Sequence, residues 1–333
     1  MKKGIGVGIE DFKKIIEEDC YYFDKTNYIE ELLKDRTEIK LFTRPRRFGK
    51  TLNMTTLKYF FDVKNAEENR KLFKDLYIEE SEYFKEQGQY PTIFITLKDT
   101  KNNKWEEMYS NIKNLISNLY NEFEYIREKL NEVEKEKFYK IWSKAEDGDY
   151  ENSLKLLSEY LYRYYQKEVV LLIDEYDSPL ITANQYAYYK EAINFFRNFF
   201  SSALKTNSYL KMGILTGIVQ VAKEGIFSGL NNVITYNILG EDFETFFGLS
   251  EKEVENALKY FELEYEIEEV KKWYDGYRFG NMEVYNPWSI LNYLRTKKLQ
   301  AYWVNTSDNA LIYDNLKNST VDVFNNLQTL FEG

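Results

Sequence analysis

The sequence predicts an α/β fold in which a mostly parallel sheet is flanked by helices. Two segments carry this prediction. The first is a glycine, lysine and threonine triplet at residues 49–51, which lies between a predicted strand and a predicted helix. The second is the run EVVLLIDEYD at residues 168–177, an apolar, β-branched stretch that ends in carboxylates. Uninterrupted apolar runs of this kind are typical of buried parallel strands, so both segments favour one parallel sheet.

The segment TRPRRFGKT at residues 43–51 matches a phosphate-binding loop. A short strand at residues 38–42 precedes it, and apolar residues at near-helical spacing follow it. Backbone N–H groups at the start of a helix, together with the positive end of its dipole, bind anionic oxygens. We therefore expect Lys50 to reach the β and γ phosphates of a nucleotide and the Thr51 hydroxyl to ligate Mg²⁺.

One position of this loop departs from the general pattern G-x-x-x-x-G-K-[ST]. The pattern places its first glycine where this chain has Arg44, which is followed by Pro45. Glycine at that place normally allows a tight turn with the backbone close to phosphate, so this chain must turn by another route. A basic surface turn ahead of an ordinary helix is the alternative for this segment.

Between the loop and the second apolar run, the pattern predicts a strand and then helices. TIFITL at residues 92–97, which follows a proline, is predicted to be the next strand. A helical insertion is expected at about residues 100–166, because apolar side chains from Trp105 to Tyr125 recur on one helical face.

Two adjacent carboxylates follow the strand predicted at residues 169–173. In phosphate-loop NTPases, such a strand delivers an Asp to the metal and often a Glu to the attacking water. We expect Asp174 to be the Mg²⁺ partner and Glu175 to be the general base that orients water in line with the γ phosphate. The alternative is that these residues and Asp177 are solvated acids at a strand end. Because both segments occur in the right order, the sequence predicts a P-loop NTPase core.

The remaining chain is predicted to complete the sheet and then to form helices. KMGILTG at residues 211–217 is expected to be another core strand. We expect the P-loop core to occupy residues 1–245 and a small helical subdomain to occupy residues 246–333. Within the subdomain we expect helices at 254–261, 270–274 and 288–294, and a turn at 275–280.

Six blocks of the sequence resemble a known family. In chain order they are DFKKIIEEDCYYFDKTNYIEELL, TRPRRFGKTLNMTTLKYFF, LLIDEYDSPL, LTGIVQVAKEGIFSGLNN, WYDGYRFG and YNPWSILNYL. Together they resemble bacterial AAA-ATPase-like proteins, which are commonly fused to a C-terminal PD-(D/E)XK nuclease-like domain. The resemblance runs over almost the whole chain, and RPRRFGKT is the family's own form of the loop. It implies an ATP-binding P-loop domain with a helical extension.

The resemblance supports an assignment of the site residues. For the nucleotide we assign Arg46, Arg47, Phe48, Gly49, Lys50, Thr51, Leu52 and Thr216; for Mg²⁺, Thr51 and Asp174; and for catalysis, Lys50, Asp174 and Glu175. Thr216 closes a strand, where it could sense the γ phosphate or be merely structural. The segment at residues 24–26 is expected near adenine or, alternatively, as an amino-terminal helix cap.

The resemblance also raises the question of a catalytic arginine. It implies an arginine in many relatives at the position of Gln220, so a contribution of that kind is lost or moved in this chain. Arg46 and Arg47 offer replacement charge near the phosphates. Arg278 is a second candidate if the C-terminal part folds over the nucleotide. A solvated loop and a simple packed turn are the respective alternatives.

Composition narrows the possible chemistry and setting. The 333 residues include no histidine and one cysteine, so catalytic triads that need histidine and zinc sites of Cys/His type cannot be built. Carboxylates, lysines, hydroxyls and a bound metal suit Mg²⁺-assisted phosphoryl transfer. We expect a cytoplasmic protein without a disulfide framework or membrane contact. The net charge of −10 argues against a surface that binds nucleic acid over its whole extent.

These observations favour a slow Mg²⁺-dependent ATPase that couples nucleotide state to conformation. The alternative is a nucleotide-gated regulatory or binding module, which bound ATP would order without appreciable turnover. No convincing PD-(D/E)XK motif is found, so we expect the nuclease-like domain to be absent. Nucleic acid would be a partner only through that missing domain. The sequence sets no oligomeric state.

Overall fold

A computed structural model describes residues 2–220, 226, 232–263 and 267–303 of the protein. Five of its strands form one sheet: β1 (Ile39–Thr43), β2 (Thr92–Thr96), β3 (Val169–Asp174), β4 (Leu210–Gly217) and β5 (Val233–Tyr236). Their order across the sheet is β2-β3-β4-β1-β5, and every neighbouring pair is parallel. The α/β fold with a mostly parallel sheet is thus confirmed. The loop strand β1 and the carboxylate strand β3 are not neighbours, because β4 lies between them.

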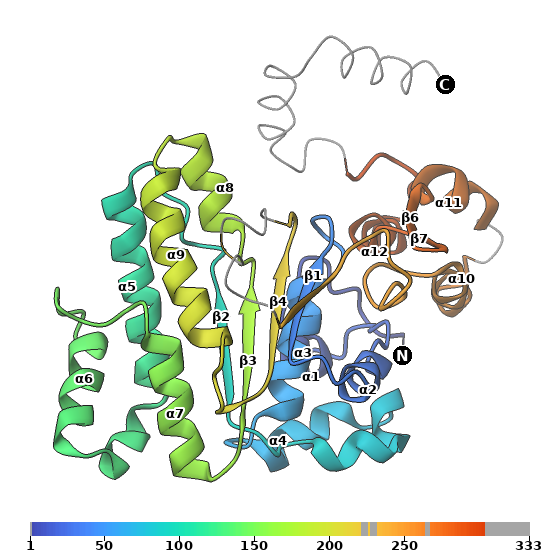
Figure 1. Ribbon diagram of the computed structural model, residues 1–333. Coiled ribbons are helices and arrows are strands. Elements are labelled where there is room, and N and C mark those ends of the chain that lie inside the picture. The colour runs from blue at the N-terminus through green and yellow to red at the C-terminus, as the bar shows by residue number, and fades with distance from the viewer. Residues whose placement is uncertain (1, 221–225, 227–231, 264–266, 304–333) are drawn as a thin grey trace.

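Helices cover both faces of this sheet (Figure 1). One face carries α1 (Phe12–Glu17), α2 (Asn27–Lys34), α3 (Lys50–Phe61), α4 (Ala66–Arg70) and the 3₁₀ turns η1 (Lys71–Phe73), η2 (Tyr77–Glu80) and η3 (Glu82–Glu86). The other face carries α5 (Trp105–Glu122), η4 (Glu124–Lys129), α6 (Glu132–Trp142), α7 (Ser153–Tyr165), α8 (Ser178–Gln185) and α9 (Tyr189–Leu204). Alternate residues of β3 therefore belong to two different cores, as the pleat of a strand requires.

The helices expected between the second and third strands are present. In α5, the side chains of Met108, Ile112, Ile116 and Leu119 are buried against the sheet side, as their helical spacing predicts. This helix ends at Glu122, before the predicted Tyr125, because the chain tightens there into η4. These helices and α9 share one hydrophobic core with the sheet.

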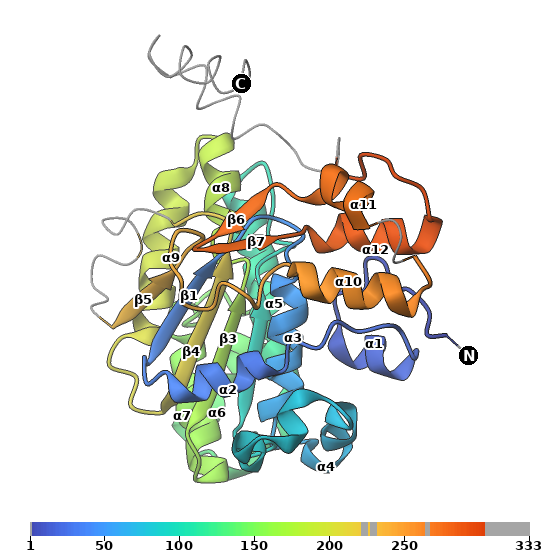
Figure 2. The same cartoon turned by 90° about the vertical axis from the view of Figure 1, so that its right-hand side faces the viewer.

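The C-terminal part contains a hairpin that the sequence analysis did not predict. The elements of the C-terminal part are α10 (Glu251–Tyr260), α11 (Ile267–Tyr274), β6 (Tyr277–Phe279), β7 (Met282–Val284) and α12 (Pro287–Thr296), and β6 and β7 form the hairpin. The turn expected at residues 275–280 is wrong in part, because β6 occupies residues 277–279 and pairs antiparallel with β7. Gly280, at φ +52°, begins the two-residue connection. Figure 2 shows these elements on the side of the sheet that α3 covers.

Two predictions fall partly outside the described residues. They are the end of the C-terminal subdomain, at residues 304–333, and most of the block that follows residue 220. Within the described residues, no helix combines the length and the apolar character needed to cross a membrane.

Candidate functional site

The predicted phosphate loop lies between β1 and α3. Gly49 is the residue before the helix and has a left-handed backbone with φ +79°, a conformation that favours glycine. The helix then begins at Lys50 and continues for 12 residues, so its first backbone N–H groups and its positive dipole end face the loop. Arg47 also has a positive φ, of +69°. Two left-handed residues therefore shape the loop where the general pattern relies on an earlier glycine.

Arg44 is fully buried, so the alternative of a basic surface turn is wrong at this position. Its guanidinium donates to the carbonyl oxygens of Thr43 and Tyr236, at 3.0 and 2.7 Å, and of Phe243 at 3.3 Å. It also lies 4.9 Å from the ring centroid of Phe247 and 5.4 Å from that of Phe279. Burial lowers the pKa of Arg44 to about 10, which leaves the group charged at neutral pH. Arg44 thus anchors the start of the loop to the end of β5 and to the segment after it.

The next side chains of the loop face the C-terminal part. Phe48 is buried with its ring centroid 4.9 Å from that of Tyr277 and 5.1 Å from that of Phe279, both in β6. The Arg47 guanidinium lies 4.2 Å from the ring centroid of Trp288 in α12. Both side chains therefore contact the C-terminal part. At Arg47 and Phe48, the backbone is the group that stays available to a nucleotide.

Lys50 is turned inward, toward its own loop. The side chain is 7% exposed, and its Nζ donates to the carbonyl oxygens of Arg44 and Pro45 at 3.0 and 2.9 Å. Burial lowers the pKa of Lys50, and the carboxylates of Glu175, Asp174 and Asp177 oppose that shift. The ammonium therefore lies in the field of the carboxylate segment that the sequence analysis paired with this loop.

A cluster of hydroxyl groups surrounds Asp174 at the carboxyl ends of the strands. Thr51 Oγ1 donates to Asp174 Oδ2 at 2.8 Å, Thr216 Oγ1 donates to Asp174 Oδ1, and Thr96 Oγ1 lies 3.5 Å from Asp174 Oδ2. Asp174 is fully buried, so the alternative of a solvated acid is wrong here. Burial raises its pKa, and the Thr216 and Thr51 hydrogen bonds oppose that rise. Thr51 and Asp174, 123 positions apart, are thus brought into direct contact.

The two acids after Asp174 have different surroundings. Glu175 has a positive φ of +51° and accepts a hydrogen bond from Ser178 Oγ at 2.9 Å. Asp177 is 1% exposed, and its Oδ2 accepts from the backbone N–H groups of Ile218 and Val219, each at 2.8 Å. Asp177 therefore fixes the chain where it leaves β4, a role that the sequence analysis missed.

Thr96 was also missed, although a sequence signal for it exists. It ends β2 in register with Asp174 at the end of β3, and neighbouring parallel strands end at one edge of a sheet. A polar residue that closes an apolar strand next to the carboxylate strand is the pattern that could have identified it.

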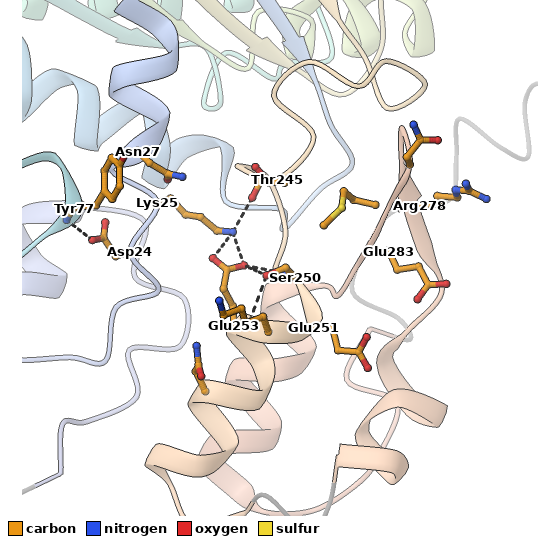
Figure 3. A pocket seen from close by; sticks show the side chains of 14 residues that line it. Asp24, Lys25, Asn27, Tyr77, Thr245, Ser250, Glu251, Glu253, Arg278 and Glu283 are labelled. Carbon is orange, nitrogen blue, oxygen red and sulfur yellow. Dashed lines mark hydrogen bonds and ion pairs between the residues drawn. The ribbon is translucent and has the colours of Figure 1, made fainter. Parts of the chain in front are cut away.

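The segment at residues 24–26 acts as a connector. Asp24 accepts from the backbone N–H groups of Thr26 and Tyr77, at 2.8 and 2.7 Å, and Thr26 caps α2 without a side-chain hydrogen bond to it. Lys25 Nζ donates to the carbonyl of Thr245 at 2.8 Å and to Glu253 at 2.6 Å (Figure 3). Thr26 therefore occupies the helix-cap position that the alternative assigned to this segment, and the segment also joins α2 to η2 and to the C-terminal part.

The other predicted side chains lie farther from Asp174. Arg278 is exposed and lines a groove of about 1100 Å³ between α2, α10 and the β6–β7 hairpin, together with Lys25 (Figure 3). Gln220 is exposed as well, and Arg46 is half-buried. Among the described residues, none of these three side chains forms a hydrogen bond or ion pair with Asp174, Glu175 or Thr51, so the structure does not bring them into the hydroxyl cluster.

A small apolar cavity of about 80 Å³ adjoins Gly49 and Leu52. Tyr22 and Phe23 form part of its wall on the amino-terminal side, and Leu291 of α12 lies in the wall contributed by the C-terminal part. The described residues contain no group of three or more carboxylate or cysteine side chains that could hold a metal ion. A divalent cation at Thr51 and Asp174 would thus need further oxygen ligands from water or phosphate.

Comparisons with known proteins agree with this geometry. The family described as "Predicted AAA-ATPase" matches residues 6–227. A protein of Azotobacter chroococcum mcd 1, named "Uncharacterized protein in vnfD 5'region", is 25% identical over 317 residues. The match covers 94% of this chain and 56% of that protein, so the chain spans little more than half the length of this relative. No solved structure matches. By the extent of the family match, the chain belongs to the predicted AAA-ATPase family, which is an ATPase-like, nucleotide-binding family.

Proposed function

We propose that the chain binds ATP with Mg²⁺ at the carboxyl edge of the sheet and hydrolyses the nucleotide slowly. The observation that carries this proposal is the 2.8 Å hydrogen bond from Thr51 to Asp174. It joins the first turn of the loop helix to the carboxylate strand. In phosphate-loop NTPases, a loop Thr or Ser and a strand Asp hold the metal that accompanies the nucleotide.

The donors present fit Mg²⁺. Hydroxyl and carboxylate oxygens are the ligands that this hard cation prefers, with water and phosphate oxygens completing its shell. Thr51 would ligate the ion, and Asp174 would hold it directly or through water. When bound, the ion neutralises charge on the transferring phosphoryl group.

The chain's own residues would then divide the work. The backbone at Gly49 and the amino end of α3 would hold phosphate oxygens, and Lys50 would exchange two loop carbonyls for the β and γ phosphates. Glu175 would accept a proton from the attacking water, and Thr216, whose hydroxyl donates to Asp174, would sense the γ phosphate.

A second candidate function is a nucleotide-gated module without appreciable turnover. The cavity beside Gly49 supports it, because the amino-terminal segment and α12 both form its walls. A base bound in this cavity would contact both walls. ATP could therefore change the position of the C-terminal helices whether or not it is cleaved.

Phosphate release and calorimetry test the proposal together. Lys50→Ala should weaken ATP binding more than tenfold, about 1.4 kcal/mol, because a charge-assisted contact is lost. Lys74→Ala, which removes an exposed lysine, is the matched control. Unchanged affinity in Lys50→Ala would contradict the loop assignment. If wild type and Glu175→Gln bind ATP but release phosphate at the same background rate, the gated module is the function.

Three further expectations stay part of the proposal. They are the division between a core at residues 1–245 and a C-terminal subdomain, contact with nucleic acid through an additional nuclease-like domain, and a cytoplasmic location. The first is supported by the separate hydrophobic cluster around α10, α11 and α12. The other two rest on the family resemblance and on composition.

A further inference from the structure

The turn between β2 and α5, at residues 97–104, lies beside the carboxylate pair and is firmly held. The backbone N–H of Leu97 donates to the carbonyl of Asp174 at 3.0 Å, which extends the β2–β3 ladder. Thr100 is 2% exposed and its hydroxyl donates to the carbonyl of Leu97 at 2.8 Å. The Tyr188 hydroxyl, from the start of α9, donates to the carbonyl of Asn102. The turn is therefore fixed relative to β3.

The turn and the strand end before it contact both carboxylates of the pair. Thr96, the last residue of β2, places a hydroxyl near Asp174. Lys101, at its middle, places Nζ 3.9 Å from Glu175 Oε2, the same oxygen that accepts from Ser178 Oγ at 2.9 Å. Among the described residues, no hydrogen bond to the other oxygen, Oε1, is found. One oxygen of Glu175 is thus held by two groups from different elements, and the other stays available.

We propose that Lys101 is a positioning residue for Glu175, an inference that rests on the proposed ATPase function. Lys101 and Ser178 hold Oε2, so Oε1 is the atom that faces the attacking water. In the reaction, the water oxygen forms a bond to the γ phosphorus while the bond from that phosphorus to the β–γ bridging oxygen breaks. The water proton passes to Oε1 and the electron pair of the broken bond leaves with ADP. Lys101 neither gives nor takes a proton.

Lys101 is the cation that forms an ion pair with Glu175 among the described residues. The Lys50 ammonium also lies in the field of Glu175, but it donates to two carbonyls of its own loop. Lys98, three positions earlier, is committed to Glu10 through an ion pair of 2.6 Å. Gln220 is neutral and exposed. The Lys101 side chain is itself 46% exposed. Its position therefore depends on the ion pair with Glu175 and on the well-held turn that carries it.

Steady-state turnover and calorimetric ATP affinity should be measured with Mg²⁺ for wild type, Lys101→Met, Lys101→Arg and Lys104→Met. Lys104→Met removes an exposed lysine from the same turn and is the matched control. We expect Lys101→Met to lower kcat about tenfold with ATP affinity unchanged, because a misplaced base costs rate and not binding. Lys101→Arg should recover most of the rate, and Lys104→Met should match wild type.

A second comparison separates positioning from direct action on the phosphate. In a Glu175→Gln background, Lys101→Met should cause no further loss, since its effect acts through Glu175. Ser178→Ala should reproduce the fall in kcat, because the serine holds the same oxygen. A loss that persists without Glu175, or a weaker ATP affinity, would overturn the positioning role. Equal rates for Lys101→Met and Lys104→Met would overturn it as well.

These measurements distinguish a failure of the positioning role of Lys101 from a failure of the proposed ATPase function. If wild type turns over no faster than Glu175→Gln, the ATPase proposal fails first and takes this inference with it. If wild type turns over faster than Glu175→Gln, and Lys101→Met and Ser178→Ala keep the wild-type rate, the ATPase proposal stands and the positioning role alone is wrong.

Discussion

Arg44 occupies the place at which a phosphate loop usually has a glycine, and it uses that place for packing. Three backbone carbonyls accept from its guanidinium, while Phe247 and Phe279 flank it. A planar group with several fixed donors satisfies such an arrangement, whereas an ammonium does not. Arg44 therefore fixes the start of the loop by its side-chain contacts. The left-handed backbone conformations of the loop lie at Arg47 and Gly49.

Arg44→Lys should lower the free energy of unfolding by about 2–3 kcal/mol, because a single ammonium cannot match the planar fork of donors that now serves three buried carbonyls and lies near two rings. The control is Arg46→Lys, at a half-buried neighbouring residue, and it should change the free energy of unfolding by less than about 0.5 kcal/mol. Urea denaturation followed by circular dichroism measures both. Similar midpoints for the two variants would show that the buried contacts of Arg44 contribute little.

Asp174→Asn should stabilise the nucleotide-free protein at neutral pH while it weakens the response of ATP binding to Mg²⁺. Burial raises the pKa of Asp174 above its ordinary 3.8. A carboxyl with a raised pKa in the folded state costs stability above that pKa, and this cost is lost as the pH falls toward the ordinary value. We expect the midpoint of thermal unfolding to rise by a few degrees at pH 7, and the gain to shrink toward about pH 4.

The control for this experiment is Asp242→Asn, which removes an exposed carboxylate. It should leave both the thermal midpoint and the Mg²⁺ response close to those of wild type. If Asp174→Asn unfolds at a lower temperature than this control at every pH, its hydrogen bonds outweigh the cost of its buried charge.

At the scale of elements, the sequence predicts the helices and strands that have a regular apolar pattern and the polar residues at the ends of the strands. The runs that became β1, β2, β3 and β4 are apolar and almost fully buried, so their composition identifies them. Asp174 and Thr216 could be predicted because each lies at the end of such a run, and Thr51 because it completes the Gly-Lys-Thr triplet that follows one. Their mutual contacts stay a finding of the structure.

Other features depend on tertiary contacts that no local pattern reports. The strand β5 is short and half-exposed at the sheet edge, with Ile234 47% exposed, so its residues lack a buried-strand signature. The anchoring roles of Arg44 and Asp177 rely on carbonyls and N–H groups far away in sequence. Lys101 looks like any loop lysine until β2 is placed beside β3.

Phe279→Ala should weaken ATP binding about tenfold, although the residue belongs to a hairpin distant in sequence from the loop. Its ring packs on Phe48 and lies near Arg44, so its loss leaves a cavity behind the phosphate loop. Phe123→Ala, buried in the other core, should cost comparable stability and leave affinity unchanged. Calorimetry on both variants decides, and equal affinities would show that the hairpin does not shape the loop.

At the scale of the whole molecule, Lys25 joins the core to the C-terminal part across the large groove of Figure 3. Its ion pair with Glu253 measures 2.6 Å, with 11% and 24% of the two side chains exposed. Burial lowers the pKa of Lys25, and Glu253 opposes that shift. A partly buried pair of this kind is costly to break from one side, because the remaining charge loses its partner.

Lys25→Met should therefore loosen the C-terminal helices without unfolding the sheet. We expect amide hydrogen exchange in α10 to rise about tenfold while exchange in α3 stays as in wild type. Lys252→Met, another lysine of the same groove, serves as the control because it is exposed and forms no ion pair among those seen in the described residues. If the amides of α10 exchange at the same rate in both variants, the link through Lys25 does not hold the C-terminal part in place.

The position of β4 has a consequence for how the protein is made. The ribosome completes the loop strand and the carboxylate strand first, yet neither can pair with the other, because the strand that separates them is residues 210–217. A nascent chain that has not yet released this segment holds both halves of the site without a ladder between them. Assembly of the proposed nucleotide site therefore waits until residues 210–217 have been synthesised, and until then β1 and β3 each have an edge that lacks its partner β4.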